Sequence, residues 1–149
     1  LVIVDPYFGG EELVRFIPFI GGMNVTAKIL SSAKFLKKDI KDSEEIEEEG
    51  DRLKKKLDDY PEKELLNQIE INVMEGDQPN IHDRFIVCDE NCWLLGSSLN
   101  DFGSSGTMIK KLTQPSVVIE DIQNELTEEA LLFSDWISDR RDRREGHSE

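Results

Sequence analysis

Short apolar segments alternate with amphipathic segments along nearly the whole chain of 149 residues. Apolar runs bounded by turn residues predict strands, whereas apolar residues at spacings of three and four predict helices. The expected strands are residues 1–4, 25–30, 69–74 and 107–112, together with a hairpin that begins at residue 81 and breaks at Glu90-Asn91. Strands separated by helices predict an α/β sandwich in which helices cover a central mixed sheet.

The expected helices follow the same reading. Residues 11–19 have helical spacing before Gly21-Gly22, which predicts the end of that helix. Asp42 with Glu45 is typical of a capping box at the start of a charged helix that stops before Pro61. A short helix is expected at residues 62–68, and Pro115 fits the first turn of a long helix. Its apolar stripe consists of Val118, Ile122, Leu126, Phe133 and Trp136.

Chain length predicts one domain, because about 150 residues suffice for a single hydrophobic core. We assign residues 1–138 to this domain and residues 139–149 to a polar tail that we expect to be frayed. The chain starts directly in an apolar strand without Met, so we expect an upstream region that is missing here.

Composition indicates a soluble, cytoplasmic domain. No apolar run reaches the roughly 18 residues that span a bilayer, and no signal-peptide pattern precedes the first strand. Cys88 and Cys92 lie near the facing ends of the hairpin strands, which favours two buried thiols over a disulfide. No metal or other cofactor is expected, since His147 has no ligand spacing around it.

The hairpin contains the residues with the clearest chemistry. Because side chains alternate along a strand, His82 and Arg84 are expected to share one face. A neutral imidazole can attack a phosphodiester, and a guanidinium binds two phosphate oxygens in bidentate fashion. Asp89 is expected at the hairpin turn. After the second strand, a small-residue loop offers further phosphate-binding donors: Gly96, Ser97, Ser98 and Asn100.

The spacing of these residues resembles the signature of the phospholipase D superfamily. The pattern His-x-Lys/Arg, four residues, Asp, six residues, Gly-Ser-x-x-Asn fits without a gap from His82 to Asn100. The resemblance implies a phospholipase D-like α/β/α sandwich with a central mixed sheet. It also implies catalytic roles for His82, Arg84 and Asp89, and phosphate binding by Arg84, Ser97, Ser98 and Asn100.

The resemblance further implies a mechanism without a metal or cofactor. In the family, two such motifs meet at a pseudo-twofold axis, where one histidine forms a phosphohistidine and the other protonates the leaving oxygen. This chain supplies one motif. We therefore expect either a homodimer or a second motif in the missing region.

Two departures from the family pattern bear on activity. Arg84 stands where the family usually has Lys, and a planar guanidinium holds phosphate differently from an ammonium. Many active members also have a carboxylate soon after the Asn, which orients the histidine, but residues 102–112 contain none. Asp101 or Glu120 is the expected substitute.

The net charge of −14 is unusual for a protein that binds a polyanion. Much of the acidic charge lies in residues 43–51 and in the last helix, away from the motif. A small positive rim near the motif is expected from Lys110 and Lys111 and from the three lysines that follow the second strand, Lys34, Lys37 and Lys38.

The sequence therefore favours a metal-independent phosphodiesterase that acts on nucleic acid, with DNA favoured over RNA. Two alternatives stay open. One is a non-catalytic phosphate- or nucleic-acid-binding and dimerisation module of a larger protein, which Arg84 and the absent carboxylate favour. The other is a phospholipid hydrolase, which would need an apolar or membrane-binding rim.

Overall fold

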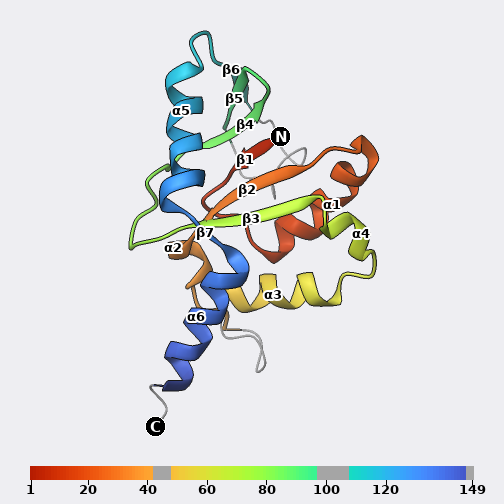
Figure 1. Cartoon of the computed structure of the whole chain (residues 1–149), viewed down its shortest axis with the longest axis vertical. Helices are drawn as coiled ribbons and strands as arrows, with labels where there is room; N and C mark the ends of the chain where they lie inside the picture. Colours follow the sequence, from red (N-terminus) through yellow and green to blue (C-terminus); the bar gives the residue numbers. More distant parts are fainter. Residues whose placement is uncertain (42–47, 97–107, 147–149) are drawn as a thin grey trace.

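The computed structural model describes residues 1–41, 48–96 and 108–146. Within these ranges, seven strands form one sheet in the order β6-β5-β4-β1-β2-β3-β7 (Figure 1). The strands are β1 (Val2–Val4), β2 (Ala27–Ser32), β3 (Ile69–Met74), β4 (Arg84–Cys88), β5 (Asn91–Leu95), β6 (Ile109–Lys111) and β7 (Leu131–Leu132). The helices are α1 (Gly10–Met23), α2 (Ala33–Leu36), α3 (Glu49–Asp59), α4 (Lys63–Leu66), α5 (Ser116–Asn124), the π-helix η1 (Glu125–Glu129) and α6 (Phe133–Gly146).

The sheet is mixed, as the alternation of segments predicts. β1, β2 and β3 are parallel, and helices form the crossovers that parallel neighbours require. β4 runs antiparallel to β1, and β5 and β6 continue this antiparallel half. β7 pairs antiparallel with β3 at the opposite edge.

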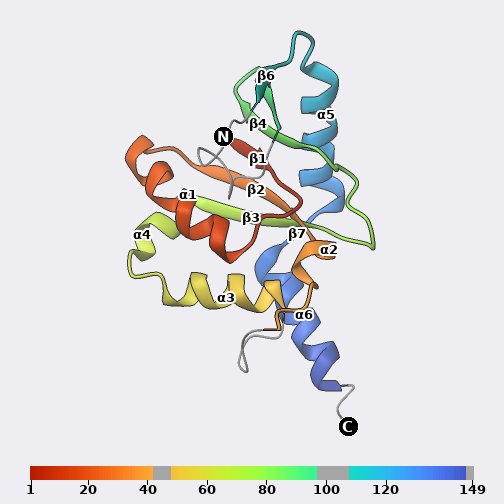
Figure 2. The same cartoon turned by 180° about the vertical axis from the view of Figure 1, so that it is seen from behind.

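Successive residues of the central strands enter two separate cores. Ile3 and Ile29 pack into a core with α1, α2, α3 and α6, whereas Val4 and Leu30 pack into a second core that includes Ile122 of α5. Because side chains alternate along a strand, these cores lie on opposite faces of the sheet. In both views α5 lies on one side of the sheet, and α1, α3 and α4 lie on the other (Figure 1 and Figure 2).

Helix α1 differs from the expected helix at its end. It continues through Gly21-Gly22 to Met23 and ends at Asn24, whose left-handed φ of 51° stops it. Gly21 lies against the side chain of Leu65, and a Cβ there would meet that side chain at 2.7 Å. The glycine therefore serves helix packing, and the expected break was wrong.

Helix α3 ends before Pro61, as expected. The described part of this region begins at Glu48, whose backbone N–H donates to Asp51 Oδ2 at 3.0 Å and closes a capping box. The expected capping box at Asp42 and Glu45 lies outside the described residues.

The expected long helix after Pro115 is instead two helices separated by η1 and the short edge strand β7. Val118, Ile122 and Leu126 pack into the core under α5, whereas Phe133 and Trp136 pack into the core on the other face. The apolar stripe is continuous in sequence, but the chain crosses the sheet edge at β7 between its two halves.

Helix α6 extends to Gly146, so residues 139–146 are helical and the expected frayed tail was wrong for them. Arg140 donates to both carboxylate oxygens of Glu48, with N–O distances of 2.8 and 2.6 Å. Arg144 donates to both oxygens of Asp51 at 3.0 and 2.8 Å. These bidentate pairs bind the arginines of α6 to the start of α3.

Two smaller findings concern the cysteines and the bilayer. Cys88 and Cys92 are both free thiols, but only Cys92 is buried, so the expectation of two buried thiols holds for one of them.

Across the described ranges, we find no helix with the length and apolarity needed to cross a membrane.

Candidate functional site

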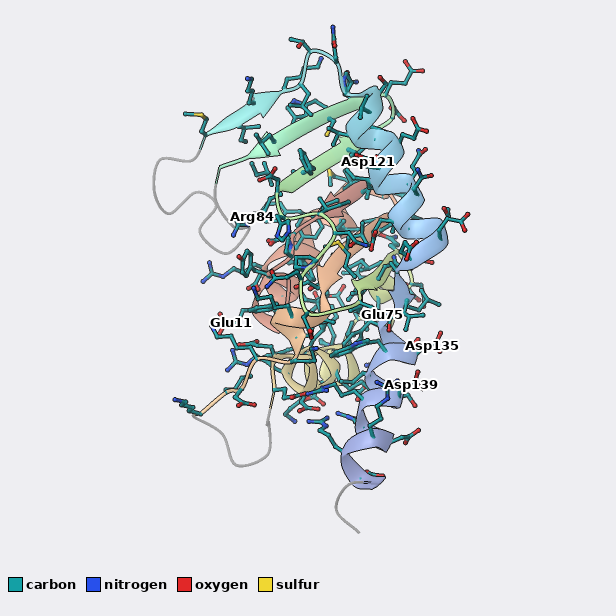
Figure 3. The ribbon with its side chains drawn as sticks, turned by 90° about the vertical axis from the view of Figure 1, so that its left-hand side faces the viewer. Glu11, Glu75, Arg84, Asp121, Asp135 and Asp139 are labelled. Carbon is teal, nitrogen blue, oxygen red and sulfur yellow. The ribbon has the colours of Figure 1, made fainter. Side chains whose placement is uncertain are left out.

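The candidate site lies where the parallel strands β1, β2 and β3 end and the chain enters β4. In open α/β sheets, ligands bind beyond the carboxyl ends of the strands. Here the segments that follow β1, β2 and β3 meet the start of β4, because β4 runs antiparallel beside β1. In Figure 3, Arg84 lies on the left-hand side of the molecule, whereas the labelled acidic residues of α5 and α6 lie on the right.

Asp5 and Arg84 form an ion pair at this junction. The register pairs Val4 with Phe85, so the residue after β1 lies opposite the first residue of β4. The guanidinium Nε–H of Arg84 donates to Asp5 Oδ1 at 3.3 Å. Asp5 is fully buried, and its Oδ2 has no hydrogen-bond partner among the residues that the structure describes. A buried carboxylate beside a partly exposed guanidinium fixes the orientation of that cation.

Tyr7 joins Arg84 to the neighbouring cavity. The guanidinium carbon of Arg84 lies 4.9 Å from the centroid of the Tyr7 ring, which is a cation–π distance. Tyr7 also meets Phe35 edge to face, with ring centroids 6.0 Å apart. The backbone N–H of Tyr7 donates to Asp5 Oδ1 at 2.9 Å, so one carboxylate oxygen holds both the cation and the aromatic residue.

Two buried serines at the end of β2 hold the segment between Asp5 and α1. Ser31 Oγ donates to the carbonyl of Phe8 at 2.6 Å, and Ser32 Oγ donates to the carbonyl of Pro6 at 2.6 Å. Ser32 also accepts from the backbone N–H of Phe35 at 3.1 Å, which caps α2. The segment that contains Tyr7 is therefore fixed by the strand beside it.

His82 lies just before β4 and not on it, because β4 begins at Arg84. The expectation that His82 and Arg84 share one face of a strand was therefore wrong for His82. The residue is exposed and lines a cavity of about 420 Å³ together with Tyr7 and Phe35. Both motif residues are therefore near Tyr7: His82 lines the same cavity, and Arg84 lies over the face of the Tyr7 ring.

The loop before His82 is attached to the π-helix. Asn80 Nδ2 donates to Glu125 Oε2 at 2.9 Å across the face that α5 covers. Glu125 is buried, and within the described part of the chain its Oε1 has no hydrogen-bond partner. A π-turn inside a helix is uncommon and is often found at functional sites. The buried carboxylate holds the chain two residues before His82.

The cavity is basic although the chain is acidic. Lys34, Lys37 and Lys38 line it with His82, and its described lining contains no Asp or Glu. The whole chain has 32 acidic and 18 basic residues, so this composition is a local reversal of the overall charge. Lys110 and Lys111 lie on β6, away from this cavity.

Asp89 is not close to the other motif residues. It lies in the two-residue turn after β4, whereas Arg84 begins that strand, and five strand positions span roughly 16 Å. Asp89 has a left-handed φ of 55°, a conformation that Asp tolerates in hairpin turns. The turn comprises Asp89 and Glu90, one residue earlier than expected, and the position of Asp89 favours a turn role over a catalytic one.

The second strand of the hairpin returns the chain to the site. β5 pairs Leu95 with Arg84, so Gly96 follows at the same end of the sheet. A Cβ at Gly96 would lie 3.1 Å from the carbonyl oxygen of Met108, which explains the glycine. Ser97, Ser98 and Asn100, the expected phosphate ligands, lie outside the described residues, as does Asp101.

Two carboxylates other than Asp5 bear on the chemistry of this region. Glu120 is exposed on α5, which covers the face opposite the aromatic cavity, so its expected role beside His82 receives no support. Glu12 is buried on α1 and accepts from the Gly9 backbone N–H at 3.1 Å. Burial raises the pKa of Glu12 from 4.5 to about 7; the Gly9 hydrogen bond opposes this rise, and the Asp5 charge adds to it.

No metal centre is formed by the parts of the chain that the structure describes, where no group of three or more His, Cys, Asp or Glu side chains has the required arrangement. The cations near the site are Arg84 and the lysines of the cavity. What the arrangement can do is bind an anion beside an accessible imidazole.

Sequence reasoning missed Asp5, Tyr7 and Glu125 as parts of the site. For Asp5 a signal exists, since a carboxylate directly after an apolar strand and before Pro6 enters a buried position. Tyr7 and Glu125 have no comparable local signal, because their contacts come from segments far away in the chain.

Comparison with known proteins supports the fold. No protein-family model matches the sequence, and no curated protein matches it. Among solved structures, the chain is similar to the phosphatidylserine synthase of Haemophilus influenzae Rd KW20, with a TM-score of 0.55 and 16% sequence identity. The match covers 90% of this chain and 34% of that one, so the chain spans about a third of that protein's length. The expected fold class, an α/β sandwich with a central mixed sheet, is confirmed.

Proposed function

We propose that the chain forms a phosphodiesterase site of the phospholipase D type, independent of metal ions, that acts on nucleic acid. The observation that supports this best is the position of His82 on a cavity whose described lining has lysines and no carboxylate, and whose wall contacts Arg84 through Tyr7. An accessible imidazole and an oriented guanidinium are the two groups that nucleophilic attack on a phosphodiester requires.

In the proposed first step, a ring nitrogen of His82 attacks phosphorus. A phosphorus–nitrogen bond forms while the bond from phosphorus to the leaving oxygen breaks, and that oxygen takes a proton from a general acid. In the second step, water gives a proton to the conjugate base of that general acid and attacks phosphorus while the phosphorus–nitrogen bond breaks, which regenerates both the histidine and the acid. Arg84 neutralises the phosphate throughout, with Asp5 fixing its orientation.

The general acid must come from outside the single motif. We propose that a second copy of the chain, paired across a twofold axis, supplies the matching histidine; a second motif elsewhere in a longer polypeptide would serve equally. Ser97, Ser98 and Asn100 complete the phosphate pocket in this proposal, through hydroxyl and amide donors.

The test is cleavage of single- and double-stranded DNA, RNA and phospholipid vesicles in excess chelator. We expect cleavage of nucleic acid that falls at least about 10³-fold in His82→Ala. The Cys88→Ser variant is the matched control, because Cys88 is exposed at the far end of β4. Cleavage that requires a divalent ion, or that survives in His82→Ala, would contradict the proposal.

A phospholipid is the second candidate substrate, favoured by the similarity to a protein named phosphatidylserine synthase. Cleavage of vesicles but not of nucleic acid in the same experiment would support it. If a folded dimer binds nucleic acid and cleaves no substrate, the chain is a phosphate-binding module.

A further inference from the structure

The basic cavity beside His82 is larger than a single phosphate needs. Its volume of about 420 Å³ lies within the range of about 300–1,000 Å³ that is typical of small-molecule sites. Its walls combine lysines with the aromatic side chains of Tyr7 and Phe35. A phosphodiester bound at His82 and Arg84 would therefore leave most of this space to another part of the same substrate.

Two lysines of the cavity, Lys34 and Lys37, are available to a ligand anion. Lys34 Nζ donates to the neutral amide oxygen Oε1 of Gln78 at 3.0 Å, and no carboxylate of the described residues forms an ion pair with it. Lys37 lies 3.8 Å from Asp77, a fully exposed carboxylate, and an exposed pair of this kind contributes little. A phosphate that enters the cavity can replace either interaction.

The aromatic side chains of the cavity indicate which chemical group of the substrate lies beside the lysines. Tyr7 is 52% exposed despite its contacts with Arg84 and Phe35. Exposed rings beside lysines are the usual platform for single-stranded nucleic acid, because bases stack on the rings while cations follow the phosphates. A duplex keeps its bases inside and cannot use such a platform.

We infer that the cavity lined by Lys34, Lys37, Lys38, Tyr7 and Phe35 is the subsite for the nucleotide next to the scissile phosphate of a single-stranded nucleic acid. The inference rests on the proposed function and specifies its substrate. The cavity also explains how a chain with a net charge of −14 would bind a polyanion, since the binding surface is locally positive.

The first experiment measures binding of fluorescently labelled (dT)₁₀ by anisotropy at several salt concentrations. The triple variant Lys34→Gln, Lys37→Gln, Lys38→Gln is compared with a control that removes the same charge from lysines of β2 and α3 outside the cavity, of which Lys54 is half-buried and the other two are exposed: Lys28→Gln, Lys54→Gln, Lys55→Gln. We expect the cavity variant to bind about tenfold or more weakly, with a salt slope reduced by about 0.7 for each phosphate that is no longer neutralised. The control should stay within about twofold of the wild type.

A second variant separates charge from folding. Replacing the same three lysines with arginine keeps the positive charge, so we expect this variant to retain most of the affinity for (dT)₁₀. Thermal unfolding of all variants checks that each is folded. An equal decrease of affinity in the cavity variant and the control variant would overturn the inference.

Two further arms distinguish the possible failures. Hydrolysis of bis(4-nitrophenyl) phosphate by the wild type, with His82→Ala alongside, tests the proposed function without using the subsite. If this substrate is cleaved but the affinity for (dT)₁₀ is the same in the cavity variant and the wild type, the proposed function is supported and the subsite is wrong. If the cavity variant loses binding to phosphatidylglycerol vesicles and not to (dT)₁₀, the ligand is a lipid and the nucleic-acid inference fails.

Discussion

Asp5 illustrates how one buried carboxylate organises the site. A single oxygen accepts from Arg84 at 3.3 Å and from the Tyr7 backbone at 2.9 Å, so the cation and the aromatic ring share one anchor. Arginine at position 84 suits this arrangement, because a guanidinium can contact a carboxylate on one side and stack on a ring.

The buried Glu12 predicts a specific pH dependence of stability. Its pKa is about 7 in the folded protein against an ordinary 4.5, so folding favours the neutral form. This contribution is complete below the unfolded pKa and is lost as pH rises through the folded pKa. Glu12→Gln removes the titration but keeps the oxygen that accepts from Gly9. We expect it to be more stable than the wild type at about pH 8, by on the order of 2–3 kcal/mol, and equal near pH 4.

Urea unfolding at the two pH values measures this difference. Glu11→Gln is the matched control, because Glu11 is exposed and its removal should change the unfolding free energy by about 0.5 kcal/mol or less. If Glu12→Gln and the wild type keep the same stability difference at both pH values, the assignment of the titration to Glu12 is wrong.

At the scale of elements, the pairing of α6 with α3 changes the meaning of the C-terminal arginines. In sequence they belong to a polar tail, but Arg140 and Arg144 make bidentate pairs with Glu48 and Asp51. The side chains of these two acids are only 9% and 10% exposed. The Arg144 hydrogen bonds lower the pKa of Asp51, which means that its ionised form is favoured by folding.

We expect Arg140→Gln with Arg144→Gln to destabilise the protein by about 2–4 kcal/mol, because two mostly buried carboxylates lose their bidentate partners and Asp51 keeps only the more distant Arg141, at 3.6 Å, as an ion-pair partner among the described residues. The exposed Arg143 offers the control Arg143→Gln, which should cost about 0.5 kcal/mol or less. Urea unfolding measures both, and amide hydrogen exchange should show the loss of protection in α6. A double variant as stable as its control would mean that the ion pairs contribute nothing to docking α6.

At the scale of the whole molecule, the site contains one histidine where the proposed chemistry needs two proton-transferring groups. His82 is exposed and lines the basic cavity, so a second copy of the chain that supplies the other group would have to approach this cavity. The acidic residues labelled on α5 and α6 lie on the other side of the molecule from Arg84 in Figure 3.

We therefore expect sedimentation velocity to show a species of twice the chain mass under conditions that support cleavage. Mixing wild-type chains with an excess of His82→Ala chains should lower the activity per wild-type chain, because mixed dimers lack one histidine. A chain that cleaves as a monomer, with activity unaffected by mixing, would contradict the dimer and require a general acid within the chain.

The sequence alone predicts much of the fold, for a local reason. β3 has the expected bounds of residues 69–74, and the helix before Pro61 ends as predicted, since alternation, spacing and proline act within a few residues. The sequence likewise predicts the hairpin of β4 and β5 that begins near Arg84, because a hairpin is a local structure, although His82 lies before its first strand.

Only the tertiary structure reveals the contacts that join distant segments. The register of β1 against β4 brings Asp5 to Arg84, and three strand ends assemble the basic cavity. The sequence also does not show that the apolar stripe from Val118 to Trp136 divides between two cores. Helical spacing indicates that a helix has an apolar face, but not which face of the sheet that helix covers. Local patterns determined the elements and the motif, whereas the partners of Asp5, Tyr7 and the C-terminal arginines depend on how those elements pack in space.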